Sequence, residues 1–405
     1  MAAVPMTLPM ARTPLPLPRE LYIESTTRCN EFCDQCPRTH LGREADRDIT
    51  PDEVERIVAQ LPALERVVLH GLGEPLLNAH LPEIIALLRA RNIWVLFNSN
   101  ALLLNERRGR ALIEAGLSEL RISLDGATPH TYARIRGVNE RALPLIIRNL
   151  TAFERLKREL GAEHPRASLW FTAMRENFHE LPRLVDIAIQ TGVREVYVQR
   201  FIYFGKGLAR EEQAVYRQAH EREEGYLAEA EARCAAEGIR FTATGATTPA
   251  DYLNAGSHAR DERPWSACQR PYRLAYITAH GNVYSCCFAP FDPGPRSQKT
   301  LGNVFEQPFA AIWNGERYAA FRAAFESDTP WPHCAGCGTR WSLLHSSPSG
   351  SPLPVGEGLG VRSRGQPSTA RRRRAAGRDW QAIRTGRQSR RPPGIPRSAA
   401  LRPMG

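Results

Sequence analysis

The sequence predicts an α/β protein built on a parallel sheet, followed by a smaller cysteine-bearing region and a disordered tail. Short runs rich in β-branched and aromatic residues alternate with helical patterns six times between residues 21 and 200. This alternation is typical of parallel strands joined by right-handed crossovers. The pattern changes at Pro264, where a hairpin signal and further cysteines begin, and again after Leu344. From these observations the sheet either closes toward a barrel or opens doubly wound.

The strand candidates are the runs at residues 21–25, 66–71, 94–99, 119–125, 168–174 and 195–200. Helical patterns separate them at residues 51–60, 81–91, 106–115, 141–160 and 179–191. The first helix has a clear start signal, because Thr50 can cap it, Pro51 suits its first turn and Glu53 stands three residues after Thr50. Gly116 and Gly192 mark the change from helix to strand.

After the sixth strand candidate, the pattern predicts a long amphipathic helix over about residues 210–237 and a short strand over residues 239–245. A β-hairpin that turns at residues 280–282 and a mainly helical segment over residues 301–325 follow. We therefore expect four parts, which are a flexible N-terminus (1–18), a core (19–240), a smaller α+β domain (241–345) and a tail (346–405).

The net charge of +11 is confined to the tail. Residues 346–405 carry 13 Arg, no Lys, one Glu and one Asp, so the preceding part of the chain is neutral and we expect it to bind no nucleic acid. The tail is dense in Pro, Gly, Ser and Arg and lacks apolar periodicity, which predicts disorder. The abrupt change after Leu344 is typical of out-of-frame or read-through translation. The alternative is an Arg-rich segment that binds RNA or an acidic partner.

The sequence also predicts a cytoplasmic location without a membrane partner. No apolar run approaches the ~20 residues that span a bilayer. The N-terminal segment is broken by prolines and does not resemble a signal peptide. In the cytoplasm, nine cysteines indicate metal or redox chemistry rather than disulfides. Cys234 lies within a helical pattern and is expected to be packed there.

Unusual residues stand where the strand candidates end. Three cysteines follow the first strand, GLGEP follows the second, NSN ends the third, SLDG ends the fourth and QRFIYFGKG follows the sixth. Because the carboxyl ends of parallel strands meet at one edge of a sheet, these segments are expected to form one site.

The three cysteines are Cys29, Cys33 and Cys36, at C-x3-C-x2-C spacing. A structural zinc site needs four ligands, and since the next cysteine is Cys234, zinc would require a histidine such as His40. A [4Fe–4S] cluster held by three thiolates instead leaves one iron free to bind a cofactor.

At these residues the sequence resembles the radical S-adenosylmethionine (SAM) superfamily. CNEFCDQC is similar to its cluster loop, in which the free iron takes the amino and carboxylate groups of SAM. The resemblance implies a partial (β/α)6 TIM-like barrel, SAM as cofactor, and a catalytic [4Fe–4S] cluster held by Cys29, Cys33 and Cys36. One departure is Gln35, because the superfamily usually has an aromatic residue there that packs on adenine.

Further SAM-binding residues follow from the same resemblance. HGLGEPLLN resembles the segment in which the backbone around Gly71 and Gly73 and the Glu74 carboxylate hold the methionine ammonium. NSN resembles a stretch near the adenosine, with Asn98 and Asn100 as candidates.

SLDGATPHTYARIRG resembles the strand-four segment that completes the pocket. The resemblance implies that Ser123 and Asp125 line the ribose and methionine pocket. It also implies that Arg136 meets the SAM carboxylate, with Arg134 as the alternative.

The C-terminal cysteines resemble the auxiliary-cluster domains called SPASM and twitch. The pattern C-x12-G-x4-C precedes a C-x2-C pair. The resemblance implies one auxiliary [4Fe–4S] cluster held by Cys268, Cys286, Cys334 and Cys337, with Cys287 as the alternative to Cys286. Full domains carry a second cluster on later cysteines, which this sequence lacks. Four thiolates would also suit structural zinc.

The resemblance implies an enzyme of the oxidoreductase or maturase type that cleaves SAM reductively and abstracts hydrogen from its substrate. It needs a reducing partner such as flavodoxin or ferredoxin. The expected substrate is a peptide or protein side chain. A small metabolite or cofactor precursor, such as a tetrapyrrole, is the alternative, because the first 18 residues are too short and proline-rich to bind a leader peptide. The alternative from another class is a zinc-stabilised nucleic-acid-binding protein.

Overall fold

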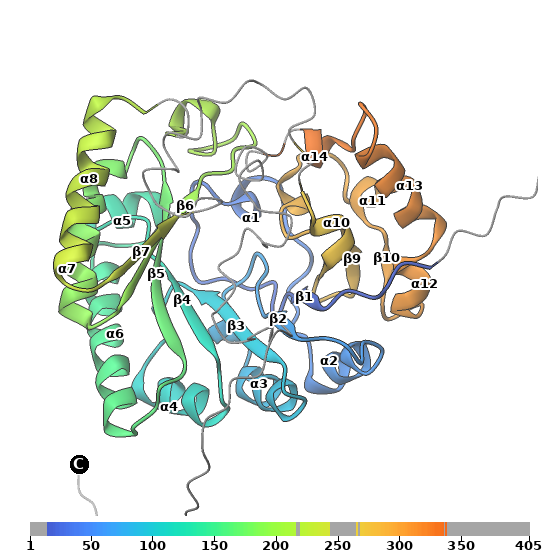
Figure 1. Ribbon diagram of the computed structural model, residues 1–405, viewed down its shortest axis with the longest axis horizontal. Helices are drawn as coiled ribbons and strands as arrows, with labels where there is room; N and C mark the ends of the chain where they lie inside the picture. Colours follow the sequence, from blue (N-terminus) through green and yellow to red (C-terminus); the bar gives the residue numbers. More distant parts are fainter. Residues whose placement is uncertain (1–13, 216–218, 244–264, 266–267, 336, 338–405) are drawn as a thin grey trace, which may run out of the picture. The chain divides into compact units, whose positions relative to one another are not determined.

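The computed structural model describes residues 14–215, 219–243, 265, 268–335 and 337. These residues form a ten-stranded sheet in the order β10-β9-β8-β1-β2-β3-β4-β5-β6-β7 (Figure 1). The strands are β1 (Glu20–Ile23), β2 (Arg66–Val68), β3 (Trp94–Ser99), β4 (Glu119–Ser123), β5 (Arg166–Ala173), β6 (Glu195–Arg200), β7 (Arg240–Ala243), β8 (Leu274–Ile277), β9 (Asn282–Tyr284) and β10 (Gly302–Asn303).

Helices connect the strands and follow them at the C-terminal end of the described chain. They are α1 (Pro37–His40), α2 (Pro51–Val58), α3 (Leu81–Ala90), α4 (Glu106–Glu114), α5 (Pro129–Arg136), α6 (Ala142–Glu159), α7 (Leu181–Thr191), α8 (Glu221–Ala236), α10 (Arg270–Arg273), α11 (Arg296–Lys299), α12 (Phe309–Trp313), α13 (Glu316–Phe325) and α14 (Pro332–Ala335).

The predicted alternation of strands and helices is confirmed. Strands β1 to β7 pair in parallel with their neighbours in chain order, as in a partial barrel. The expected hairpin is also present, because β8 and β9 pair antiparallel across Gly281, whose φ of 83° suits a glycine turn. β8 in turn pairs in parallel with β1, so the C-terminal segment extends the sheet of the barrel.

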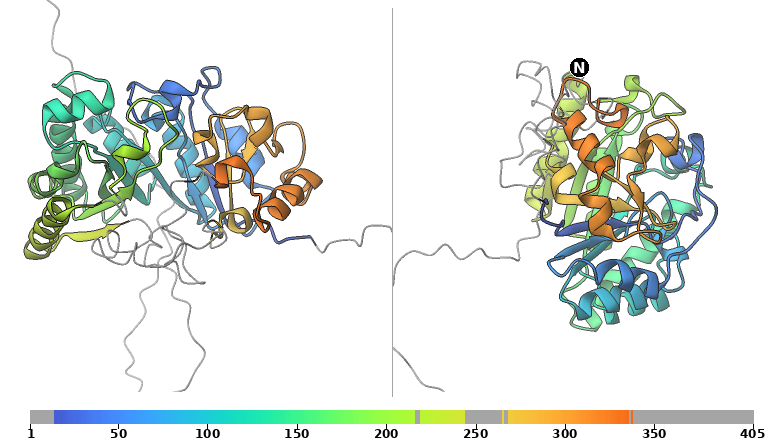
Figure 2. Two further views of the ribbon diagram at one scale, coloured as in Figure 1. Left: turned by 90° about the horizontal axis from the view of Figure 1, so that it is seen from above. Right: turned by 90° about the vertical axis from the view of Figure 1, so that its right-hand side faces the viewer.

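The two faces of the sheet carry different residues, because successive side chains of a strand point to opposite sides. In β3, Val95 and Phe97 are fully buried in the core shared with the helices, whereas Leu96 belongs to a second cluster with Tyr22 and Tyr276. Burial of each large apolar side chain contributes about 1.5–3 kcal/mol to stability. Figures 1 and 2 show α6, α7 and α8 along one side of β4 to β7, which leaves the other face for the site.

Two of the longer helices differ from the sequence prediction. Helix α5 was not predicted, although Thr128 caps it, Pro129 begins it and Gly137 ends it in the left-handed conformation. The helix expected from about residue 210 begins instead at Glu221. Residues Glu211–Gln213 form a short 3₁₀ helix instead, whose end is hydrogen-bonded to the segment after β5, since the Arg175 N–H donates to the Gln213 carbonyl over 2.9 Å. The capping box of α2 is confirmed, with Thr50 and Glu53 capping each other.

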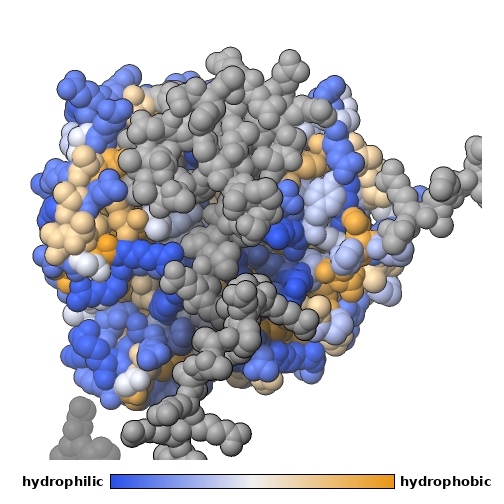
Figure 3. Space-filling view, viewed as in Figure 1, coloured by the Kyte–Doolittle hydropathy of each residue, from blue (hydrophilic) through white to orange (hydrophobic). Residues whose placement is uncertain are grey.

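The predicted flexible N-terminus lies outside the described residues up to residue 13, and the predicted disordered tail lies outside them entirely. Leu15 and Pro16 are hydrogen-bonded to the end of α12, because the Leu15 N–H donates to Asn314 over 2.8 Å and the Trp313 indole donates to the Pro16 carbonyl over 3.0 Å. Hydrophilic residues dominate much of the described surface in Figure 3. None of the described helices has the length and apolar character needed to cross a bilayer.

Candidate functional site

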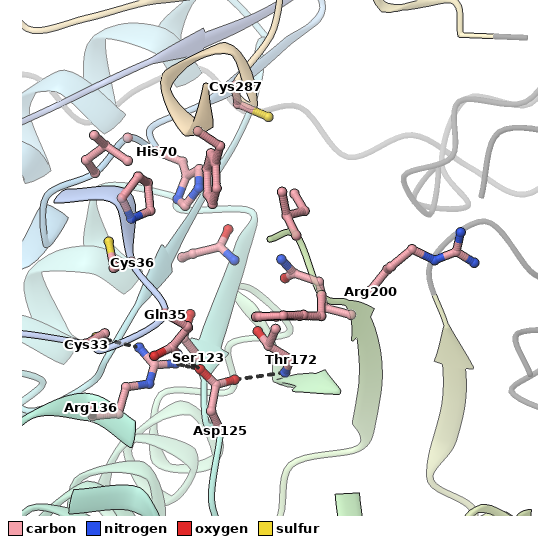
Figure 4. Close-up of a pocket in the computed structure, with 18 of the residues that line it drawn as sticks. Cys33, Gln35, Cys36, His70, Ser123, Asp125, Arg136, Thr172, Arg200 and Cys287 are labelled. Atoms are coloured by element: carbon pink, nitrogen blue, oxygen red, sulfur yellow. Dashed lines mark hydrogen bonds and ion pairs between the residues drawn. The ribbon is translucent and has the colours of Figure 1, made fainter. Parts of the chain in front are cut away.

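The carboxyl ends of the barrel strands surround a cavity of about 190 Å³ (Figure 4). Residues from the first six strands or the loops that follow them line it, together with residues of β8 and the segment after β9. Its described lining is Cys33, Gln35, Cys36, Pro37, His70, Gly71, Leu72, Asn98, Ser123, Asp125, Arg136, Thr172, Gln199, Arg200, Phe201, Ile202, Tyr276, Cys287 and Phe291. The expectation that the unusual residues gather at one edge is therefore met, since each of the five predicted segments contributes at least one residue to the lining.

The cysteine loop after β1 rests on the end of α5. The Phe32 N–H donates to the Arg136 carbonyl over 3.2 Å, and the Asp34 N–H donates to the Ile135 carbonyl over 2.9 Å. Gly137 has a φ of 62°, and a Cβ there would stand 2.4 Å from the Phe32 carbonyl oxygen. The end of α5 therefore fixes the path of the loop and the positions of Cys33 and Cys36.

Among the three thiols of the loop, Cys33 is buried and Cys29 and Cys36 are partly buried. Burial raises the pKa of Cys29 to about 11 and raises the pKa of Cys33 well above its ordinary value. The charges of Cys29 and Cys36 raise the pKa of Cys33 further, which indicates that the three sulfurs lie near one another. Three thiolates at such a position need a cation among them, and thiolates are the ligands that iron–sulfur clusters use.

The geometry does not favour a mononuclear zinc site. Within the described ranges, no three His, Cys, Asp or Glu side chains converge closely enough to hold a single metal ion. His40, the fourth ligand that zinc would need, has its Nε2 2.9 Å from the Asp34 carbonyl oxygen and 3.1 Å from the Asp34 carboxylate. A cuboidal cluster places several irons between its ligands, so its thiolates need not converge on one point.

Asp125 connects three walls of the cavity. Its Oδ2 accepts from the Gln35 amide over 2.8 Å and lies 2.8 Å from Arg136 Nη2, and its Oδ1 accepts from the Thr172 N–H over 2.8 Å (Figure 4). Gln35 stands where the superfamily usually has an aromatic residue, and its side-chain amide is hydrogen-bonded to Asp125. Ser123 lies beside this group on β4.

Arg136 is buried at the boundary between the cysteine loop and this network. It is 8% exposed, with its Nη1 3.3 Å from Glu31 Oε2 and 3.7 Å from Cys33 Sγ. Glu31 also accepts from the Tyr132 hydroxyl over 2.8 Å. The alternative residue Arg134 instead forms an ion pair with Glu176, away from the cavity lining.

Glu31 was not among the residues that sequence reasoning singled out. An acidic residue between two cysteines was its only signal. Because Glu31 is 3% exposed and faces both Arg136 and Cys33, it holds the arginine against the cysteine loop.

The segment after β2 contributes mainly backbone. Gly71 lines the cavity, and Gly73 packs so closely on the first loop that a Cβ would stand 2.0 Å from the Thr26 carbonyl oxygen. The Glu74 carboxylate, 3% exposed, accepts from the Ser99 hydroxyl and the Asn100 N–H, each over 2.8 Å. Gly73 and Glu74 are thus outside the described cavity lining, and Glu74 joins the loops after β2 and β3.

Asn98 lines the cavity from β3, whereas Asn100 does not. The Asn100 side chain instead donates to Asn30 over 2.8 Å.

A second group of cysteines lies in the C-terminal segment. Cys268, Cys286, Cys334 and Cys337 line one small cavity of about 30 Å³, whose walls are largely apolar. Burial raises the pKa of Cys268 to about 12, and the charges of Cys286 and Cys337 raise it further. Cys287 does not line this cavity but lines the main one. Cys234 is 1% exposed within α8, as the sequence predicts for a packed residue.

Thr172 had no sequence signal, because it is an ordinary residue type at a strand end and only its place in the sheet brings it to the cavity. His70 lies in the predicted segment HGLGEPLLN, and Gln199 and Phe201 lie in QRFIYFGKG, although none of the three was singled out by itself. Tyr276 belongs to β8, which sequence analysis assigned to a separate part of the chain.

Comparison with known families gives two matches. A family model described as the radical SAM superfamily matches residues 23–157. A second model, SPASM, described as an iron–sulfur cluster-binding domain, matches residues 268–338.

Curated relatives and solved structures agree with these matches. The chain is 23% identical over 314 residues to the AdoMet-dependent heme synthase of Methanosarcina barkeri, covering 75% of this chain and 85% of the relative. It is 26% identical over 324 residues to the PqqA peptide cyclase of Gluconobacter oxydans, covering 76% and 78%. The fold is similar to that of Streptococcus suis SuiB bound to the precursor peptide SuiA, with a TM-score of 0.60 and 18% identity over 82% of this chain and 71% of that one.

The cysteine loop at the carboxyl edge of a parallel partial barrel, the second cysteine group and both family matches lead to one identification. The chain belongs to the radical SAM superfamily and is a radical SAM enzyme with a C-terminal SPASM-type iron–sulfur domain.

Proposed function

We propose that this enzyme holds a [4Fe–4S] cluster on Cys29, Cys33 and Cys36, and abstracts hydrogen from a peptide or protein side chain. When bound, the cluster supplies the electron that cleaves SAM and yields the 5′-deoxyadenosyl radical. The observation that carries the proposal is the shared cavity, in which Cys33 and Cys36 face the ends of β4, β5 and β6.

Two polar side chains of this cavity support a role in binding SAM. The Nε of Arg136 and the Oε1 of Gln35 are buried without a hydrogen-bond partner among the described residues. A buried polar atom left unpaired costs about 1–3 kcal/mol, so a polar ligand that satisfies both would bind favourably. In the proposal Arg136 binds the SAM carboxylate, and Ser123 and Asp125 bind its ribose.

The segments after β2 and β3 take supporting roles. The backbone around Gly71 and Gly73 binds the methionine ammonium, and Asn98 lies near the adenosine. The Glu74 carboxylate already accepts three hydrogen bonds, from Leu76, Ser99 and Asn100, so it acts on the ammonium chiefly through its charge and through the loops that it joins.

The auxiliary site is proposed to hold one [4Fe–4S] cluster on Cys268, Cys286, Cys334 and Cys337. Support comes from their common cavity and from its largely apolar walls, which exclude water. The match to an iron–sulfur cluster-binding model over residues 268–338 favours iron over zinc.

The substrate proposal rests on the charge of the cavity walls. The described lining contains two arginines, and Arg136 is already paired with Asp125 and Glu31. Figure 4 draws Arg200 pointing away from the other lining residues. The remaining wall near β6 and β8 is neutral, with Gln199, Phe201 and Tyr276. Such a wall suits an uncharged peptide side chain.

A small cofactor precursor is the second candidate, and the similarity to a heme synthase favours it. A tetrapyrrole carries several carboxylates that need cationic partners, whereas the described lining offers two arginines, of which Arg136 is already paired with Asp125 and Glu31. Titration with Fe-coproporphyrin III, followed by its Soret band, tests this candidate. We expect no saturable change, and saturable binding at micromolar concentration would favour the cofactor-precursor function.

The reductant is proposed to be an external one-electron donor such as flavodoxin or ferredoxin, in the cytoplasm. Phe32, between Cys29 and Cys33, is 64% exposed and offers an apolar contact beside the cluster loop. Exposed apolar residues of this kind often mark protein contacts.

The test of the proposed function uses protein reconstituted with iron and sulfide without oxygen. Cys33→Ala should abolish reductive cleavage of SAM to methionine and 5′-deoxyadenosine. Cys337→Ala should leave this cleavage in place and remove only the iron of the auxiliary site. If both variants cleave SAM like the parent protein, the assignment of the cluster ligands is wrong.

A further inference from the structure

One arginine lies in the wall of the auxiliary cavity. Arg270 begins α10, shortly after Cys268, and lines this cavity together with the four cysteines proposed as cluster ligands. It is 8% exposed. The rest of the described lining contains no lysine, no other arginine, no aspartate and no glutamate, so the guanidinium charge stands out from its surroundings.

The guanidinium of Arg270 has thiols rather than carboxylates around it. Among the described residues, no aspartate or glutamate forms an ion pair with Arg270, and its Cζ lies 4.4 Å from the ring centroid of Phe288. Burial lowers the pKa of Arg270, but the charges of Cys287, Cys268 and Cys286 outweigh burial and raise it. The anionic groups that act most strongly on Arg270 are therefore cysteine thiolates.

Arg136 shows the contrasting arrangement. Its guanidinium also approaches a cysteine, with Nη1 3.7 Å from Cys33 Sγ, but it is paired with Asp125 and Glu31. Carboxylates of the chain therefore balance its charge. A buried guanidinium without such a partner is costly, so Arg270 requires an anion in the auxiliary cavity.

The other polar residues around this cavity are engaged with one another. His333 Nε2 lies 3.0 Å from Ser285 Oγ, and His333 Nδ1 faces the Asp292 carboxylate over 4.0 Å. Asp292 is outside the described lining, and the Lys299 ammonium, which donates to the Asp292 carbonyl, offsets its charge. Among the described lining residues, Arg270 is thus the cation that no carboxylate balances.

We propose that Arg270 is the counter-ion of the auxiliary cluster and raises its reduction potential. This inference rests on the proposed function, which assigns that cluster to the four cysteines. A [4Fe–4S] cluster on four thiolates is an anion, and one-electron reduction adds a further negative charge. A buried cation therefore stabilises the reduced form more than the oxidised form. The step is electron uptake alone, in which the external one-electron donor is oxidised, the cluster is reduced, and no bond forms or breaks.

The apolar walls strengthen this effect. Trp265, Phe321 and Phe325 line the same cavity, and the Trp265 indole donates to the Phe325 carbonyl over 3.1 Å. Water that would screen the guanidinium is excluded there, so its charge acts over a longer distance than at the surface. Arg270 touches no substrate in this proposal. It is a positioning residue that acts through the cluster.

The test is a potentiometric titration of the reconstituted Cys33→Ala protein, in which the auxiliary cluster is followed by electron paramagnetic resonance. Arg270→Gln in this background should keep the iron and lower the midpoint potential by about 59 mV or more, which is a tenfold or greater loss in the reduction equilibrium. Arg270→Lys keeps the charge and should stay near the parent potential. Arg273→Gln, which changes an exposed arginine of the same helix, is the matched control and should change nothing.

A second measurement avoids the Cys33→Ala substitution. In the protein that holds both clusters, Arg270→Gln should shift the component of the spectrum that SAM leaves unchanged. If Arg270→Gln keeps its iron and the parent potential, the inference is overturned. It is also overturned if Arg270→Lys shifts the potential as far as Arg270→Gln does, because shape rather than charge is then responsible.

Iron content separates the remaining outcomes. If Arg270→Gln loses the auxiliary iron, the inference stands only if Arg270→Lys keeps both the iron and the parent potential, and equal loss in both variants overturns it. A parent protein whose four C-terminal cysteines hold no iron, or hold zinc, contradicts the proposed auxiliary cluster itself.

Discussion

Arg136 pairs with two buried carboxylates, Glu31 within the cysteine loop and Asp125 after β4. Its guanidinium lies 2.8 Å from Asp125 and 3.3 Å from Glu31, and both acids are at most 3% exposed. Desolvated charges of this kind depend on their partner, because an unpaired carboxylate in the interior is costly.

Arg136→Ala should therefore lower the free energy of unfolding by about 3–5 kcal/mol, the usual cost of removing one partner of a buried ion pair. Arg134→Ala is the matched control, because Arg134 is 40% exposed where it pairs with Glu176 and should cost less than about 1 kcal/mol. Urea unfolding of both variants measures the difference. If both substitutions lower the free energy of unfolding equally, the buried ion pairs of Arg136 contribute no more to stability than the exposed ion pair of Arg134.

Glu24 makes stability depend on pH. It is 3% exposed, and burial raises its pKa to about 7, although the N–H groups of Leu72 and Ala279 oppose this shift. The folded state therefore binds the proton more tightly than the unfolded state, so the stabilisation is complete below about pH 4.5 and is lost as the pH rises through 7.

Glu24→Gln should remove this dependence. Relative to the variant, the parent protein should lose about 3 kcal/mol of unfolding free energy between pH 4.5 and 7, since one pKa unit corresponds to about 1.4 kcal/mol. Urea unfolding at several pH values measures both curves. Parallel curves would mean that Glu24 titrates alike in the folded and unfolded states.

At the residue scale, the sequence predicts those site residues whose amino-acid type is unusual at the end of a strand. Cys33, Cys36, Ser123, Asp125 and Arg136 meet in the cavity as the motifs suggest. Thr172 could not be predicted, because its type is common and its role depends on which strand ends beside which.

At the scale of elements, the loops after β1 and β2 are packed backbone against backbone. The Glu74 N–H donates to the Arg28 carbonyl over 2.8 Å, and a Cβ at position 73 would stand 2.0 Å from Thr26 O and 2.6 Å from Arg28 O. Because Arg28 precedes Cys29, this contact sets the start of the cysteine loop.

Gly73→Ala should displace that loop, with a loss of about 1–3 kcal/mol or more in unfolding free energy and a fall in bound iron. Gly225→Ala is the control. Its Cβ would meet nothing within 4 Å, and within α8 it should stabilise the chain by about 0.5–1 kcal/mol. Iron analysis and thermal unfolding measure both. A Gly73→Ala protein with full iron and unchanged stability would contradict the close packing.

Helix α5 explains why some elements were missed. It has the start and stop signals of α2 and α7, but it is only eight residues long. Two of its buried residues, Thr131 and Arg136, are polar, so the helical period of apolar residues is weak in its sequence. Helices with one exposed face, such as α6, were predicted within a few residues of their bounds.

At the scale of the whole molecule, one strand joins the barrel to the C-terminal segment. β8 pairs in parallel with β1 from Leu274 opposite Glu20 to Ile277 opposite Ile23. The sequence predicts both strands but not their pairing, because the partners are about 250 residues apart and no local pattern records such a contact. The parallel pairing makes the barrel depend on the C-terminal segment.

A chain that ends at residue 243 should therefore not fold as a soluble barrel. It would leave β1 as an open edge and expose Leu21, Tyr22 and Ile23, which are at most 4% exposed in the full chain. Size-exclusion chromatography should find it aggregated, whereas the control chain that ends at His345 should elute as the full chain does. A soluble 243-residue chain with cooperative unfolding would contradict this dependence.

The central claim is that the cysteine loop holds an iron–sulfur cluster with one iron open to SAM. The direct measurement is the electron paramagnetic resonance spectrum of the reduced, reconstituted Cys268→Ala protein, in which the auxiliary cluster is removed. We predict about four irons per chain and a cluster signal that changes when SAM is added. A protein that binds no iron, or a signal that SAM leaves unchanged, would contradict the account.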